Sequence, residues 1–347
     1  MSDVNDIAVA ANVRAGSAPK VIAILAAAVA LLTALAVIHI GVGARFIGPR
    51  TVLSAMTAYD ARNLDHKIIV DLRLLRLLSG ICTGTALGLA GALLQSIVRN
   101  SLGEPHILGL NAGAALAVVL TTALGGAAVV GPLGRPLVAA IGAAVVFGLV
   151  ISMASSGKTG LTPIKATLCG IAFSAFASSF TGAILILDEQ TLMDLRIWLA
   201  GDLAGLTYPA LDYAAMVAAV GIVAAVFLAP YLNVLALGDN VARGLGVKVT
   251  AVRAGGLVCA ALLSGAAVSI AGPVGFVGLV VPHVARRFAG NDLRLLLPLS
   301  AIGGAALLLA SDIVARMVVA PQELATGVVT AIVGAPVFIL IAARSYR

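Results

Sequence analysis

The stretch "VIAILAAAVALLTALAVIHIGV", residues 21–42, decides the fold class of this chain. It contains no Asp, Glu, Lys or Arg, and it is long enough to cross a membrane, since a helix needs about 20 apolar residues to span roughly 30 Å of hydrocarbon. Membrane strands would instead alternate apolar and polar positions over about ten residues. The stretch therefore predicts a membrane-spanning α-helix.

The composition of the 347 residues extends this prediction to the whole chain. Hydrophobic residues make up 61% and charged residues 11%, with a mean hydropathy of +1.11. Such a chain has too little polar surface to cover a water-soluble core. The sequence predicts an all-α polytopic membrane protein with about ten spans, near residues 21–42, 74–97, 106–124, 134–152, 164–187, 208–229, 252–271, 274–289, 295–318 and 326–343.

These spans form one predicted transmembrane domain over residues 21–343, with short tails at 1–20 and 344–347. Lys and Arg are somewhat more numerous on the side of the N-terminus, which predicts that both termini face the cytoplasm. The connection over residues 43–72 is an exception, because it is rich in basic residues and lies outside in this topology. Either the topology is different, or these residues form a folded outer loop that meets an outer partner carrying acidic groups.

The segment "SSGKTG" at residues 155–160 resembles the end of a phosphate-binding loop, but that loop requires a glycine where this chain has Ser152. It also follows a membrane span, whereas a phosphate-binding loop follows a buried strand. We therefore interpret it as a short cytoplasmic loop. Any ATP hydrolysis would belong to a separate protein.

Few ionisable residues lie within the apolar spans. Asp312 and Arg316 are four residues apart, so they share a helical face and can form a pair. The alternative is a proton or ion site of a secondary transporter that also uses His39 or His283. His283 is a lone histidine in "AGPVGFVGLVVPHVARR", residues 271–287, where glycine and proline predict a sharp bend between two spans.

The segment at 237–250 has the pattern of a short capped helix. Asp239 or Asn240 can cap it, and Gly246 can end it. The basic residues Arg243, Lys248 and Arg253 can hold it at the cytoplasmic surface. It is either an ordinary interfacial helix or a docking element for a cytoplasmic motor.

The three cysteines lie in apolar spans without metal-ligand spacing, and the sequence predicts no metal site. No paired carboxylates or nucleophile–base arrangement favour a membrane enzyme.

Beyond about residue 70 the chain strongly resembles the permease subunits of type II ATP-binding-cassette importers. These proteins take up iron-siderophores, haem and cobalamin. The resemblance rests on the order and spacing of "RLLRLLSG" at Arg73, "GLAGALLQSIVRNSLGEPHILGLNAGAALA" at Gly88, "ARGLGV" at Ala242, "AGPVGFVGLVVPHVAR" at Ala271, "LLPLSA" at Leu296, "SDIVAR" at Ser311 and "GVVTAIVGAPVF" at Gly327.

The resemblance implies ten helices per subunit, a second permease subunit, two cytoplasmic ATPase subunits and an extracytoplasmic binding protein, with no nucleic acid among the partners. The complex would lie in the lipid bilayer of the bacterial cytoplasmic membrane. ATP and Mg would be used by the ATPase subunits, so this chain needs no cofactor of its own. The implied substrate is a ferric siderophore, with haem or cobalamin as alternatives.

The resemblance also implies roles for individual residues. A cytoplasmic gate matches Asn100 and Leu102, although Ser101 stands where the family pattern has proline. The fifth span would line the pathway through Ala172, Phe176 and Ser179. Sites that receive carboxylates of the binding protein match Arg73, Arg76 and Arg316. The ATPase-coupling segment matches Asp239, Ala242, Arg243, Gly244, Leu245 and Gly246.

Overall fold

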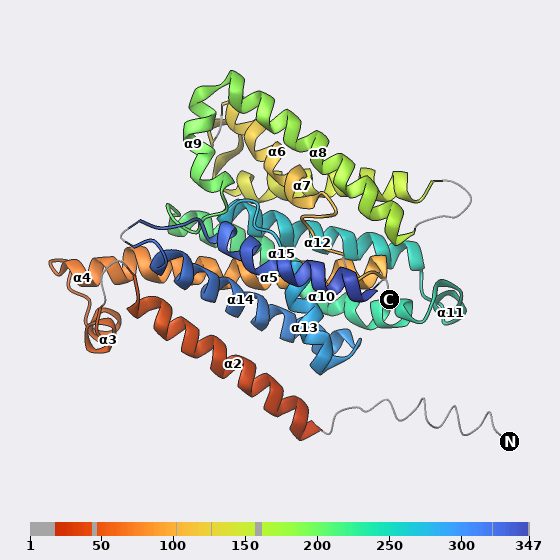
Figure 1. Ribbon diagram of the computed structural model, residues 1–347, viewed down its shortest axis with the longest axis horizontal. Coiled ribbons are helices and arrows are strands. Elements are labelled where there is room, and N and C mark those ends of the chain that lie inside the picture. Colours follow the sequence, from red (N-terminus) through yellow and green to blue (C-terminus); the bar gives the residue numbers. More distant parts are fainter. Residues whose placement is uncertain are drawn as a thin grey trace.

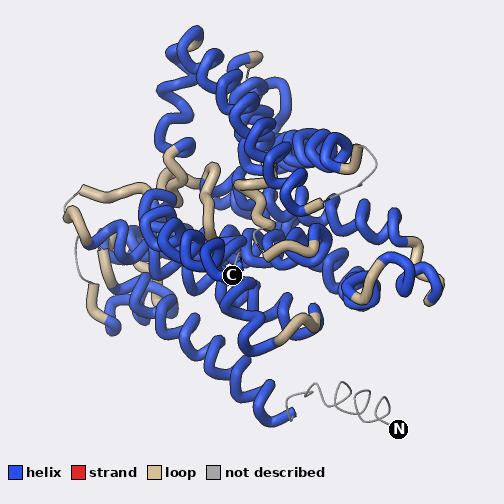
Figure 2. Tube along the Cα trace, turned by 45° about the vertical axis from the view of Figure 1, so that its right-hand side comes forward, coloured by secondary structure: helices blue, strands red, loops and turns tan. Residues whose placement is uncertain are grey.

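The computed structural model describes residues 18–43, 47–101, 103–125, 127–156, 162–320 and 322–345. Helices and their connecting loops make up the described part of the chain, and no strand occurs in it (Figure 2). The predicted N-terminal tail lies outside the described residues except for its end, where the first helix begins at Ala18. The prediction of an all-α chain is confirmed.

The elements in chain order are α2 (Ala18–Gly41), α3 (Pro49–Thr57), α4 (Leu64–Lys67), η1 (Ile68–Leu74), α5 (Leu75–Val98), α6 (Leu110–Ala123), α7 (Ala127–Ala154), α8 (Pro163–Leu187), α9 (Glu189–Leu199), α10 (Tyr208–Ala236), α11 (Asp239–Gly244), α12 (Val249–Ala271), α13 (Val277–Ala289), α14 (Leu293–Met317) and α15 (Thr326–Ser345). Seven helices of the described residues are long and apolar enough to cross a membrane. The three other predicted spans coincide with α6, α13 and α15.

Two of these shorter helices are too short to cross a membrane by themselves. α6 has 14 residues and α13 has 13, which gives each a length of about 20 Å, well short of a bilayer. Each follows a loop whose buried backbone polar groups need hydrogen-bond partners within the protein. The buried polar side chains that meet this need are described below.

The structure differs from the sequence analysis in two places. The expected outer loop at 43–72 contains α3, and its second half belongs to a continuous helix that runs through α4, η1 and α5, residues Leu64–Val98. α9 was not predicted. Its start is fixed by Asp188, whose carboxylate accepts hydrogen bonds from the N–H and the hydroxyl of Thr191, an N-cap arrangement.

α5 is the central helix, and it packs closely against α14 (Figure 1). A Cβ atom on Gly84 would lie 2.4 Å from the carbonyl oxygen of Gly304, and one on Gly88 would lie 2.1 Å from that of Ser300. The two backbones can approach this closely only because small residues face each other, as in other membrane helix pairs.

The turn between α12 and α13 is held by a similar close approach. Gly272 has φ +70°, and a Cβ atom there would lie 1.8 Å from the carbonyl oxygen of Trp198 in α9. The indole Nε1 of Trp198 donates a hydrogen bond of 2.9 Å to Val268 in α12. The bend predicted from glycine and proline is therefore present, and it is packed against α9.

Candidate functional site

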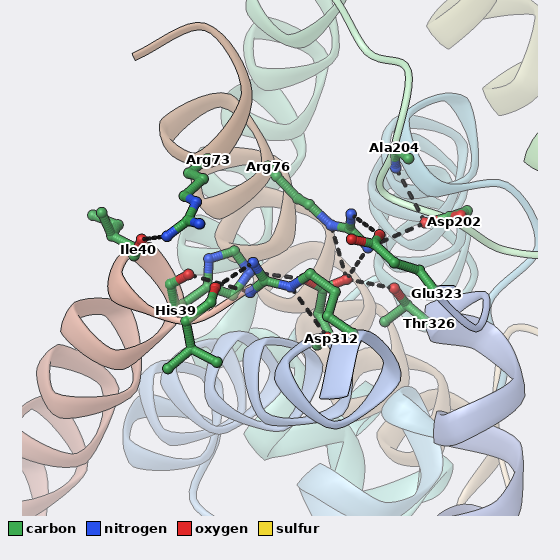
Figure 3. Close-up of polar contacts among 11 residues, drawn as sticks. His39, Ile40, Arg73, Arg76, Asp202, Ala204, Asp312, Glu323 and Thr326 are labelled. Atoms are coloured by element: carbon green, nitrogen blue, oxygen red, sulfur yellow. Dashed lines mark hydrogen bonds and ion pairs between the residues drawn. The ribbon is translucent and has the colours of Figure 1, made fainter. Parts of the chain in front are cut away.

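At the end of the molecule opposite α11, a buried cluster of charges surrounds Asp312 (Figures 1 and 3). Its carboxylate accepts hydrogen bonds from His39 Nε2 at 2.9 Å, from Arg76 Nη2 at 2.9 Å and from Thr326 Oγ1 at 2.7 Å. Arg316 Nε lies 3.1 Å from the same carboxylate, so the predicted Asp312–Arg316 pair is confirmed. Asp312 is fully occupied by partners from the protein itself.

Two of the three predicted docking arginines bind the end of α2. Arg73 Nη1 donates to the carbonyl oxygens of Ile40 at 2.7 Å and Gly41 at 2.9 Å. Arg316 Nη1 donates to Val42 at 2.9 Å. The last carbonyl groups of a helix have no partner within the helix. The two guanidinium groups supply those partners, which explains why both arginines are buried.

Arg76 has the partners nearest to solvent. Besides Asp312, it contacts Glu323 Oε2 at 2.6 Å and Asp202 Oδ1 at 3.6 Å, and the Glu323 side chain is 36% exposed. Burial raises the pKa of Asp202 above its usual value, and the positive charge of Arg76 opposes this shift. Arg73, Arg76 and Arg316 all line one cavity of about 430 Å³ together with Glu323.

The structure thus brings the three predicted docking residues together, and their role in docking stays a prediction. Glu323 and Thr326 are not predicted from the sequence, and His39 is linked to Asp312 only in the alternative of a proton or ion site. His39 and Asp312 are 273 residues apart, so no local spacing could indicate their contact. The one available signal was a histidine in an otherwise apolar span.

The predicted coupling segment forms α11 at the other end of the molecule (Figure 1). Ala242 is fully buried, whereas Val241 is 49% and Leu245 is 63% exposed. Arg243 and Gly244 are also exposed. A short helix that buries one small residue and presents apolar side chains to its surroundings is suited to contact with another protein. Its role in coupling stays a prediction.

The predicted gate lies in the loop that follows α5. Asn100 is half-buried, its N–H donates to the carbonyl of Gln95 at 3.2 Å, and its carbonyl accepts from the N–H of Gly103 at 3.0 Å. Leu102 lies outside the described residues. The preceding Arg99 has φ 52°, in the left-handed region, and ends α5.

The same loop supports the turn between α12 and α13. Glu104 is 2% exposed, and its carboxylate accepts a hydrogen bond from the N–H of Phe276, the residue before α13. Asn111 Nδ2 donates to the carbonyl of Val274 at 2.8 Å, and Gln95 Nε2 donates to Gly278 at 3.2 Å. These three side chains provide hydrogen-bond partners for backbone groups in the turn and at the start of α13.

The predicted pathway residues share one exposed face of α8. Ala172, Phe176 and Ser179 are all exposed, and their spacing places them on one side of the helix. The opposite side of α8 carries hydroxyl groups and lines a cavity. Ser174, Ser178 and Thr181 line a cavity of about 610 Å³, together with His106 and Pro273. Among the described residues, no group of His, Cys, Asp and Glu is arranged to hold a metal ion.

Residues 28–344 match the family model described as the FecCD transport family. The chain belongs to the FecCD transport family. Its relatives include a probable siderophore transport system permease protein of Bacillus subtilis, 39% identical over 298 residues, which are 86% of this chain and 89% of the relative. A vitamin B12 import system permease protein of Vibrio vulnificus is 37% identical over 321 residues, 91% of this chain and 92% of the relative.

A solved ABC transporter structure in an inward-facing conformation has the same fold as this FecCD-family chain. The two are 27% identical, the TM-score is 0.74, and the match covers 92% of this chain and 99% of the other. The chain is therefore a multi-pass permease of the ABC transporter type. The resemblance seen in the sequence motifs is confirmed.

Proposed function

We propose that this chain is the permease subunit of an ATP-driven importer that carries a ferric siderophore into a bacterial cell. It pairs with a second permease subunit, receives its substrate from an extracytoplasmic binding protein and is driven by two cytoplasmic ATPase subunits that use ATP and Mg. It lies in the cytoplasmic membrane with both termini in the cytoplasm. The observation that carries this proposal is the family match over residues 28–344, within which α11 presents exposed apolar side chains at one end.

The positions of the helix ends support the orientation. α2 begins and α15 ends toward the end of the molecule that carries α11 (Figure 1). If α11 contacts cytoplasmic ATPase subunits, both of these ends are cytoplasmic. The cavity with the three arginines then opens on the outer side, where it would meet carboxylates of the binding protein. Charged contacts of this kind favour orientation and rapid encounter.

An ion-coupled secondary transporter is the alternative from another class. It needs a carboxylate or histidine within the membrane that can bind and release the coupling ion. Asp312 is the buried acid that the sequence offered for this role, and its carboxylate already has four partners. This occupancy favours the ATP-driven mechanism.

The deciding experiment is transport by the purified complex in lipid vesicles. Uptake of radiolabelled iron bound to a siderophore should require ATP on the cytoplasmic side, and it should persist when proton and sodium gradients are abolished. Uptake that follows an ion gradient without ATP would exclude the proposal. Parallel vesicles given haem or cobalamin identify the substrate within the family, because only the true substrate should be taken up.

A further inference from the structure

α11 is anchored to two neighbouring helices through one carboxylate. Asp239 Oδ1 accepts a hydrogen bond from Arg99 Nη2 at 2.7 Å and another from Arg253 Nη2 at 2.9 Å. Arg99 ends α5, and Arg253 lies in α12, the helix that follows α11. Any displacement of the first residue of α11 therefore acts on both helices.

Arg99 and Arg253 lie in different structural elements. Arg253 is in the first turns of a long helix. Arg99 is the first residue of the α5–α6 loop, directly before the predicted gate residue Asn100. Its guanidinium also donates to the carbonyl of Leu235, near the end of α10. The side chain of Arg99 is therefore held at the base of α11, while its backbone begins the gate loop.

The ends of α11 are both made by glycine. Gly238 precedes the helix with φ +116°, and Gly246 follows it with φ +80°, conformations that other residues adopt only with strain. A Cβ atom on either glycine would meet nothing within 4 Å. α11 is thus a separate short unit between two glycines. Within the described residues, its side-chain ion pairs to α5 and α12 come from Asp239.

We propose that Asp239 is a positioning residue that passes the displacement of α11 to the gate loop through Arg99. The inference rests on the proposed function, because α11 requires an ATPase subunit to move it. Arg253 holds the carboxylate in place from the other side. Asp239 would therefore act inward, on the permease, whereas Val241 of the same helix and Leu245, the residue directly after it, are exposed. The resemblance to type II importers implies only that Asp239 belongs to the ATPase-coupling segment.

The ion pairs at Asp239 are partly exposed to solvent. The side chains of Asp239 and Arg253 are each 28% exposed and that of Arg99 is 38% exposed. Pairs as exposed as these contribute little to stability. Neutralising Arg99 should therefore leave the protein folded, and its effect should appear in the response to ATP.

The test uses the complete transporter in inside-out vesicles. Cys82, Cys169 and Cys259 are replaced by alanine, and Ser101→Cys places one thiol in the gate loop beside Asn100. The rate at which a membrane-impermeant maleimide labels this thiol is measured with and without ATP. Arg99→Gln and Asp239→Asn are compared with Arg253→Gln, the matched control that removes the other partner of the same carboxylate. Arg99→Lys restores the charge.

In the parent variant, ATP should change the labelling rate several-fold. Arg99→Gln and Asp239→Asn should remove most of that change, Arg253→Gln should keep at least half of it, and Arg99→Lys should recover part of it. The amount of ATPase subunit that co-purifies is measured in every variant and should not fall, which separates lost transmission from lost assembly.

Two results would overturn the inference. One is an ATP response of parent size in Arg99→Gln. The other is equal loss in Arg99→Gln and Arg253→Gln, which would assign transmission to α12. Failure of the proposed function looks different: no ATPase subunit would co-purify even with the parent variant, and ATP would not change its labelling.

Discussion

Asp312 joins four helices through one carboxylate, because His39 comes from α2, Arg76 from α5, Arg316 from α14 and Thr326 from α15. A buried charge is tolerated only when partners of this kind compensate for the loss of water. The sequence correctly predicted the partner that is four residues away. It could not predict the partners that are brought together by packing of distant helices.

Replacement of this carboxylate tests how much the cluster stabilises the end of the molecule opposite α11. Asp312→Asn keeps the shape of the side chain but leaves His39, Arg76 and Arg316 without a shared counter-charge. We expect a loss of about 3 kcal/mol or more in the free energy of unfolding, measured by circular dichroism of the detergent-solubilised protein. Asp194→Asn, on the exposed side of α9, is the control and should melt like the parent. Equal melting of both variants would contradict the role of the cluster.

At the scale of elements, the long helices were predictable because apolar length is a local property of the sequence. The predicted spans at 21–42, 164–187 and 295–318 agree closely with α2, α8 and α14. The helices that the sequence does not predict depend on the positions of charged and capping residues. The helix from Leu64 to Leu74 carries charged residues, which resemble those of a loop between spans. α9 is too short and too polar for a membrane span, and its clearest local signal is the capping residue Asp188.

Glycine-to-alanine substitution should have opposite effects on stability at Gly88, which lies in the close contact between α5 and α14, and at Gly182, which has open space around it. Gly88→Ala places a methyl group on the backbone of α14, and we expect it to destabilise the protein by about 1–3 kcal/mol or to prevent folding. Gly182→Ala in α8 meets nothing within 4 Å. It should stabilise that helix by about 0.5–1 kcal/mol. Thermal unfolding of the two variants in the same detergent measures both effects, and a tolerated Gly88→Ala would show that the helices can separate at little cost.

For the whole molecule, the exposed face of α8 has two possible surroundings, lipid or a water-filled pathway next to a second permease subunit. The proposed function requires the second. Cysteines placed at Phe176 and Ser179 in the cysteine-free protein should then react with a small water-soluble thiol reagent in intact vesicles. Val29→Cys, on the exposed face of α2, is the control for a lipid-facing position.

We expect the α8 thiols to react at least tenfold faster than the thiol on α2, because thiolates form in water and not in hydrocarbon. Similar slow reaction at all three positions would place the α8 face in lipid. The sequence indicated α8 as the pathway helix only through resemblance. No chemical feature of Ala172, Phe176 or Ser179 distinguishes a pathway from a lipid-facing surface.

Trp198 is the single tryptophan of the chain, and it lies where α9, α12 and the turn at Gly272 meet. Its indole donates to Val268, and the guanidinium of Arg135 lies 4.7 Å from its ring centroid. A single indole in a defined setting is an intrinsic fluorophore. Its emission reports whether α9 stays packed on α12 during a transport cycle, so changes at this junction can be followed in real time without attaching a label.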